Sequence, residues 1–266
     1  YKASLSPINI TLISFIFGLA PVFLVQIVQP SLDYTLPIYL TMTLYFLYSG
    51  WFFPAALAGV LTVFTKESGF MLYGVSVFLY VPLMFIKGSL TWRNKKRLLS
   101  VTALLSIPIV LFIVYMLVTP KTQIGDSWIE GILKMLKFYL VDPVMAAQLV
   151  SLLVLNFGWI LTGIIVAGLV VLGVNRLKGR GRTEAGLGFY DRLYFYLLFI
   201  LFFYFLTRIP MWNNPRYMLP VLPVVVILLA DSLPIVFKRQ TVITSVLAVL
   251  LVMLTISSFR TIDPVS

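Results

Sequence analysis

Long apolar stretches separated by short polar breaks dominate the chain. A membrane-crossing helix needs about 20 apolar residues, because ~30 Å of hydrocarbon divides by ~1.5 Å of rise per residue. On this measure the pattern predicts about nine spans. A glycine and a proline, Gly50 and Pro54, interrupt the apolar run between the second and third spans and predict a tight hairpin. The predicted spans are Ile8–Val28, Tyr34–Tyr48, Ala55–Phe64, Phe70–Ile86, Leu99–Val118, Val144–Val174, Leu193–Thr207, Tyr217–Phe237 and Val242–Ser258.

Composition supports the same fold class. Apolar residues make up 61% of the 266 positions and charged residues only 11%, whereas about 25% charged residues is usual in a soluble protein. So few polar groups cannot cover so much apolar surface in water, which excludes a soluble enzyme, a disordered chain and a nucleic-acid-binding domain. We therefore expect an all-α, polytopic helical membrane bundle, with residues 1–266 forming a single transmembrane domain. The sequence contains no His and no Cys, which excludes Ser-His-Asp triads, thiol nucleophiles, haem histidines and zinc sites built from these ligands.

The charges predict an orientation. Twenty Lys and Arg residues stand against nine Asp and Glu, a net charge of +11. Most of the bases fall in the loops 87–98 and 175–192 and in the turn Lys238–Arg239, which the positive-inside rule makes cytoplasmic. We expect these bases to contact anionic membrane lipids rather than nucleic acid. Alternation of the spans then places Asp33, the turn 65–68, the segment 119–143 and the segment 208–216 on the outer face.

Two charged positions on the predicted outer face are candidates for chemistry. Asp33 follows the stretch Gln26–Pro30 at the outer end of the first predicted span. Its carboxylate could act as a general base or bind a cation, or it could be the N-cap of a helix that begins near Tyr34. Lys66 and Glu67 lie between two spans. Lys66 fits a phosphate ligand, or it neutralises Glu67 and extends its ammonium to the membrane surface.

Two longer outer segments carry further candidates. Residues 126–140, within the segment 119–143, have the pattern of an amphipathic helix with one apolar and one charged face. Such a helix would lie in the membrane interface, either as a membrane anchor or as a lip that positions a lipid substrate. The segment 208–217 is either a wet turn with aromatic anchors or a site for phosphate and sugar. Its candidate side chains are Arg208, Trp212, Asn213, Asn214, Arg216 and Tyr217.

One carboxylate lies inside a predicted span. Asp231 sits toward the cytoplasmic end of its apolar run, close in sequence to Lys238 and Arg239. These two bases are the expected neutralising partners, and we assign Asp231 no role in a mechanism.

Three stretches on the predicted outer face carry a family resemblance. The first ends at Asp33, the second reads G-x-x-x-x-x-T-K-E through Lys66, and the third reads R-Y-x-L-P-x-x-P from Arg216. In this order they resemble the GT-C class of polyprenyl-phosphate-sugar-dependent glycosyltransferases, including protein O-mannosyltransferase-like and aminoarabinose-transferase-like proteins. The resemblance extends from about residue 8 to residue 240 and implies a GT-C-like bundle.

The resemblance also implies site roles. Asp33 would be the second catalytic acidic residue of the active site, near the acceptor or a metal, and Lys66, Arg208 and Arg216 would bind the donor phosphate. A divalent metal is compatible with this chemistry, but the sequence does not require one. The implied partners are a polyprenyl-phosphate-linked sugar, membrane lipids and an acceptor hydroxyl on a protein, lipid or glycan. The implied location is a prokaryotic plasma membrane with the active site facing outward. The side chains expected to line the substrate are Glu67, Trp212, Asn213, Asn214 and Tyr217.

The chain departs from the family pattern in one respect. The family's principal acidic motif lies in the first outer loop, which would precede Tyr1, and we expect a longer protein to supply it. Two other classes stay open: a non-catalytic membrane scaffold subunit with a GT-C-like fold, and a secondary transporter or lipid flippase. A transporter favours charges at the bilayer midplane, whereas these charges gather at helix ends.

Overall fold

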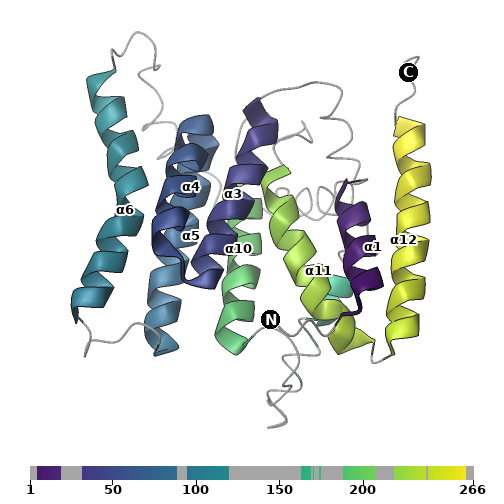
Figure 1. Cartoon of the computed structure of the whole chain (residues 1–266). Helices are drawn as coiled ribbons and strands as arrows, with labels where there is room; N and C mark the ends of the chain where they lie inside the picture. The colour runs from purple at the N-terminus through teal and green to yellow at the C-terminus, as the bar shows by residue number, and fades with distance from the viewer. Residues whose placement is uncertain are drawn as a thin grey trace, which may run out of the picture. The chain divides into compact units, whose positions relative to one another are not determined.

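The fold is helical throughout the part of the chain that the structure describes. This computed structural model describes residues 5–18, 32–88, 95–119, 163–168, 170, 174, 188–207, 219–237 and 239–261. No strand occurs in these ranges, so the all-α prediction is confirmed for them (Figure 1). The helices are α1 (Pro7–Gly18), α3 (Leu32–Ser49), α4 (Phe52–Thr65), α5 (Glu67–Ile86), α6 (Lys95–Val118), α10 (Phe189–Thr207), α11 (Leu222–Val236) and α12 (Gln240–Thr261).

Some of these helices are long enough to span a membrane. Among the described residues, three stretches are long and apolar enough to cross a bilayer: Ser68–Ile86, Lys96–Val118 and Leu219–Val236. Shorter apolar helices occur at Pro7–Ile16, Phe52–Thr65 and Gln240–Met253. A membrane character is thereby supported, and the larger number of spans stays a prediction.

Two helices begin inside segments that the sequence analysis assigned to loops. The predicted loop 87–98 is shorter than expected, because α6 already begins at Lys95. Lys and Arg are good helix formers, so the basic run joins the helix that follows it. The predicted loop 175–192 also ends early, since α10 begins at Phe189 and includes Arg192. An acidic residue, Asp191, stands in the first turn of α10, where it favours a helix N-terminus.

The described contacts divide the chain into two compact units. The first unit comprises residues 1–31, 150–199 and 221–266, and the second comprises residues 32–149 and 200–220. The helix α10 contributes to both, because the division falls between Phe199 and Ile200. Each unit is described separately below.

The second unit begins with the predicted hairpin, which the structure confirms. Gly50 turns the chain between α3 and α4 with a φ of +74°, a conformation that glycine adopts without a steric cost. The N–H groups of Gly50 and Trp51 donate to carbonyls in the last turn of α3, at 3.1 and 2.9 Å. Pro54 is not part of the turn between the two helices. It stands in the first turn of α4, where its missing N–H has no helical partner to lose.

Two tyrosines join α5 to its neighbours in the second unit. The Tyr73 hydroxyl donates to the carbonyl of Leu105 on α6 at 2.8 Å. The Tyr80 hydroxyl donates to the carbonyl of Leu47 on α3, also at 2.8 Å. Both tyrosines are buried. Pro108 lies inside α6, so the Tyr73 bond reaches this helix in the turn where proline has already removed one backbone donor.

Replacing Tyr73 with phenylalanine removes one buried donor and keeps the ring. We expect a loss of about 1 kcal/mol, the usual contribution of one hydrogen bond, and a midpoint of thermal unfolding lower by roughly 2–4 °C. Thermal unfolding of the purified protein in detergent measures this shift. Tyr45→Phe is the matched control, because Tyr45 is 58% exposed. An equal shift in both variants would contradict the prediction.

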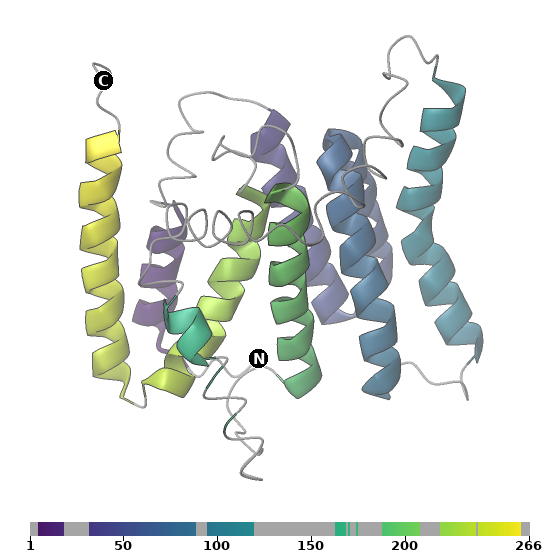
Figure 2. The same cartoon turned by 180° about the vertical axis from the view of Figure 1, so that it is seen from behind.

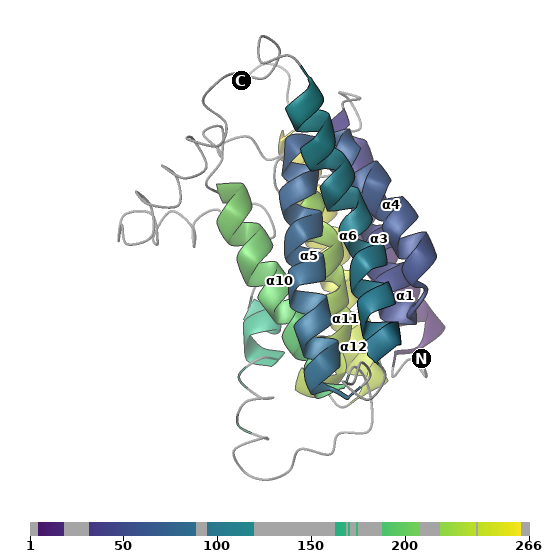
Figure 3. The same cartoon turned by 90° about the vertical axis from the view of Figure 1, so that its left-hand side faces the viewer.

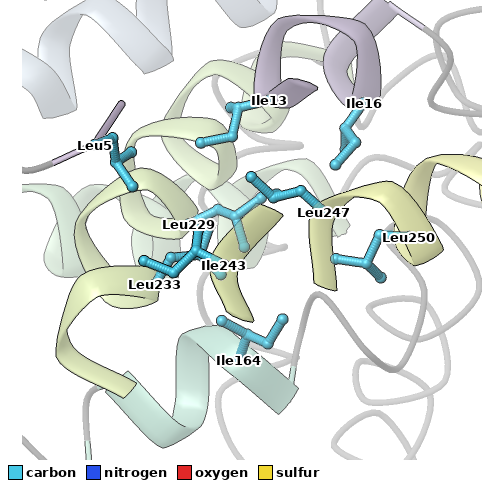
Figure 4. Close-up of a cluster of buried hydrophobic side chains, with 9 residues drawn as sticks. All are labelled: Leu5, Ile13, Ile16, Ile164, Leu229, Leu233, Ile243, Leu247 and Leu250. Carbon is cyan, nitrogen blue, oxygen red and sulfur yellow. The ribbon is translucent and has the colours of Figure 1, made fainter. Parts of the chain in front are cut away.

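The first unit has an apolar core between α1, α11 and α12. Nine buried side chains meet there, including Ile164 from the helical residues 163–168 (Figure 4). They are Leu5, Ile13, Ile16, Ile164, Leu229, Leu233, Ile243, Leu247 and Leu250. Next to this core, α1 and α12 run in the same direction, side by side (Figures 1 and 2). Their starts are joined by the buried amide of Asn9, which donates to Gln240 at 2.8 Å and accepts from Thr244 at 2.7 Å.

Candidate functional site

One end of the second unit gathers several predicted site positions. The first turn of α3 lies beside the first turn of α5, because a Cβ added to Gly69 would meet the Leu36 side chain at 3.0 Å. The end of α6 lies there too, since the rings of Phe70 and Phe112 stack with centroids 4.7 Å apart. Figure 3 looks onto α5 and α6 of this unit. We call this region the Lys66 end: the first turns of α3 and α5 and the last turns of α4 and α6.

The T-K-E-S-G stretch forms a sharp corner at this end. Lys66 alone separates α4 from α5 and is extended, with φ −163° and ψ 155°. The Gly69 N–H donates to the Lys66 carbonyl at 2.8 Å, which closes the corner. A Cβ at Gly69 would collide with the carbonyl oxygen of Thr62. The glycine is therefore required for the close approach of α5 to α4 that fixes the Lys66 backbone.

Two features of the corner can attract an anion. The backbone N–H groups of the first turn of α5 carry about half a positive elementary charge at a helix N-terminus. Lys66, whose side chain is half-buried, is the residue directly before this helix. The backbone of Glu67 begins α5, and the position of its side chain lies outside the described part. A lysine and a helix N-terminus together fit a phosphate better than either does alone.

Asp33 belongs to the same end by its backbone. The structure begins α3 at Leu32, so Asp33 lies within the first helical turn and not at the N-cap that the sequence suggested. A carboxylate in a first turn is favoured by the helix dipole, which explains the early start. Pro37 has no N–H for the carbonyl of Asp33, its normal helical acceptor four residues earlier.

An aromatic cluster, not anticipated from the sequence, covers the Lys66 end. Besides the Phe70–Phe112 stack, Phe64 contacts Phe112 and Tyr115 with ring centroids 5.9 and 5.6 Å apart. Phe64 and Tyr115 are substantially exposed, whereas Phe112 is buried. The sequence feature that could have indicated this cluster is the position of Phe64 and Phe70 on the two sides of the corner. The cluster gives the corner an apolar, aromatic flank of the kind that contacts lipid chains and interfaces.

The other predicted positions cannot be placed with this group. The segment 120–143 lies outside the described residues. So do the predicted phosphate and substrate positions of the segment 208–217: Arg208, Trp212, Asn213, Asn214, Arg216 and Tyr217.

A second polar centre, in the first unit, was missed by the sequence interpretation. The Nε of Arg192 donates to the Oδ2 of Asp231 at 2.8 Å, and the two side chains are only 8% and 1% exposed. Arg192 was expected in a loop, and Lys238 and Arg239 were expected to neutralise Asp231. The partner that the structure shows is Arg192, 39 positions away along the chain. A carboxylate within the apolar α11 was the available signal, because such a group needs a partner.

The described residues are helical, three of their stretches are long and apolar enough to cross a membrane, and Lys66 forms the corner between α4 and α5. We compared the chain with protein-family models, with curated proteins and with solved structures, and none of them matches.

Proposed function

We propose that the chain is a membrane glycosyltransferase of the GT-C type with about nine spans, which moves a sugar from a polyprenyl-phosphate donor to an acceptor hydroxyl on the outer face. The observation that carries this proposal is the Lys66 corner. It combines a half-buried lysine, the N-terminus of α5 and the first turn of α3, which contains Asp33, at one end of the second unit. An anionic, lipid-linked group at a membrane surface matches this combination of charge and apolar flank.

The reaction assigns a role to each group. The acceptor oxygen attacks the anomeric carbon of the sugar, and the bond from that carbon to the phosphate oxygen breaks. The electron pair of this bond stays with the polyprenyl phosphate, whose added negative charge Lys66 and the α5 N-terminus stabilise. Asp33, or an acidic group elsewhere in the protein, takes the acceptor proton. Arg208 and Arg216 would complete the phosphate site, and Glu67 and Tyr217 would line it.

The helix directions in the second unit are compatible with spans that cross the membrane alternately inward and outward. In the second unit, α3 and α5 start at the Lys66 end, where α4 and α6 finish. The exposed bases Lys87 and Lys96 therefore belong to the opposite end. An outward Lys66 and cytoplasmic Lys87 and Lys96 follow from this arrangement and the positive-inside rule.

Cysteine labelling tests this orientation in a chain that has no natural cysteine. We expect Asp33→Cys to react with a membrane-impermeant maleimide added outside intact cells. Lys96→Cys, which is exposed at the opposite end, should react only after the membrane is opened. Labelling of Lys96→Cys in intact cells would contradict the orientation.

A secondary transporter is the second candidate, because the buried Arg192–Asp231 pair resembles the intramembrane charges of such proteins. Donor binding tests the proposed phosphate site. We expect the purified protein in nanodiscs to bind polyprenyl phosphate at least about tenfold more tightly than the neutral polyprenol, a difference of about 1.4 kcal/mol. Lys66→Gln should abolish this preference, and Lys96→Gln should retain it. Equal binding of the two lipids by the unmodified protein would overturn the proposed phosphate site.

A further inference from the structure

The buried pair in the first unit belongs to a larger polar group, which we call the Arg192 cluster: Arg192, Tyr196, Asp231, Ser232 and the carbonyl of Ile165. The Tyr196 hydroxyl lies 3.2 Å from the Ser232 hydroxyl and 3.5 Å from the Ile165 carbonyl oxygen. All four side chains are buried. The cluster therefore joins α10, α11 and the helical residues 163–168 through buried polar contacts.

The packing of the cluster is close as well as polar. A Cβ at Gly168 would collide with the Ser232 side chain, so only glycine lets the helix 163–168 approach α11 at this position. Tyr196 then reaches both partners from α10. The contacts connect residues 165, 192 and 231, which are far apart along the chain.

Burying the charge of Arg192 or of Asp231 without the other is energetically unfavourable. A single buried charge without a partner costs several kcal/mol, and removing one member of a buried ion pair is strongly destabilising. Replacing both members with apolar residues of similar size is often neutral. Arg192 and Asp231 therefore tolerate an apolar surrounding only together, after α10 and α11 have met in the correct register.

We infer that the Arg192 cluster is an assembly determinant of the first unit: its matched charges penalise arrangements in which α10 and α11 are separated or shifted. The ion pair and the Tyr196–Ser232 contact together fix how α10 and α11 lie against each other. This inference concerns how the first unit assembles and does not depend on the proposed transferase activity. The Lys66 end belongs to the other unit.

Charge-deletion variants test the inference. In the purified full chain, we expect Arg192→Met and Asp231→Leu each to lower the midpoint of thermal unfolding by on the order of 10 °C. We expect the double variant to unfold within about 3 °C of the unmodified protein, because no unpaired charge remains. Arg239→Met is the matched control, since Arg239 is an exposed base of the same unit, and it should leave the midpoint unchanged.

A yield measurement covers variants that fail to fold. The fraction of monodisperse protein recovered from membranes should fall at least about fivefold in each single variant and return in the double variant, in line with an uncompensated buried charge. Additive losses, with the double variant worse than either single variant, would overturn the inference. So would single variants that behave like Arg239→Met in both measurements.

Discussion

If the chain is the proposed transferase, we expect Lys66→Gln to lower the rate of sugar transfer from a polyprenyl-phosphate donor by on the order of 100-fold, the usual effect of removing one group that stabilises developing charge. In the proposed reaction the leaving phosphate gains negative charge as the glycosidic bond breaks, and Lys66 stands directly before the N-terminus of α5. Glutamine keeps much of the side-chain length and a hydrogen-bond donor but loses the charge. Initial rates with a labelled donor, measured on the full-length protein in liposomes, give the ratio.

Two further variants make the Lys66 result specific. Lys66→Arg keeps the positive charge and should retain more activity than the glutamine variant. Lys96→Gln removes an exposed positive charge at the opposite end of the second unit and should transfer at the unmodified rate. If Lys66→Gln transferred sugar as fast as Lys96→Gln, the corner would not be the phosphate site.

Replacing Gly69 with alanine disturbs the corner itself. The added methyl group would occupy the place of the Thr62 carbonyl oxygen, and backbone on the far side of the contact yields less readily than a side chain. We expect a loss of about 2–3 kcal/mol of folding stability, as for other overpacked sites, and a reduced transfer rate because Lys66 moves with the corner. Thermal unfolding and transfer rates, measured on the same preparation, report the two effects.

Gly74→Ala is the matched control on the same helix. A Cβ at Gly74 meets nothing within 4 Å, and alanine favours a helix by about 1 kcal/mol over glycine. This variant should therefore be as stable as the unmodified protein or slightly more stable. Equal destabilisation at both positions would mean that a general sensitivity of α5 to substitution, rather than the Thr62 contact, explains the Gly69 result.

The sequence predicted local features of the second unit well. The positions of α3, α4, α5 and α6 follow from the lengths of the apolar runs, and their observed ends differ from the predicted ones by a few residues. Gly50 marked the hairpin because positive φ is a local property of one residue. The break at Lys66 was also visible, since two adjacent charges interrupt two apolar runs.

The long-range pairings could not be predicted in the same way. Nothing in the apolar pattern indicates that Arg192 meets Asp231, because apolar helices of similar length fit together in many registers. The same holds for Tyr73, because its partner is a backbone carbonyl, a group that every residue carries. A sequence reveals that a buried carboxylate needs a partner, but only the packing of α10 on α11 selects which base it receives.

Transfer of labelled sugar from a polyprenyl-phosphate donor tests the central claim most directly. The full-length protein, reconstituted in liposomes, is incubated with the labelled donor and a cell-envelope extract that supplies acceptor hydroxyl groups. The proposed function predicts that label leaves the lipid fraction and appears in the acceptor fraction, and that Lys66→Gln slows this movement while Lys96→Gln does not. Label that stays on the donor, under conditions in which the protein binds polyprenyl phosphate, would contradict a transferase and favour a binding or transport role.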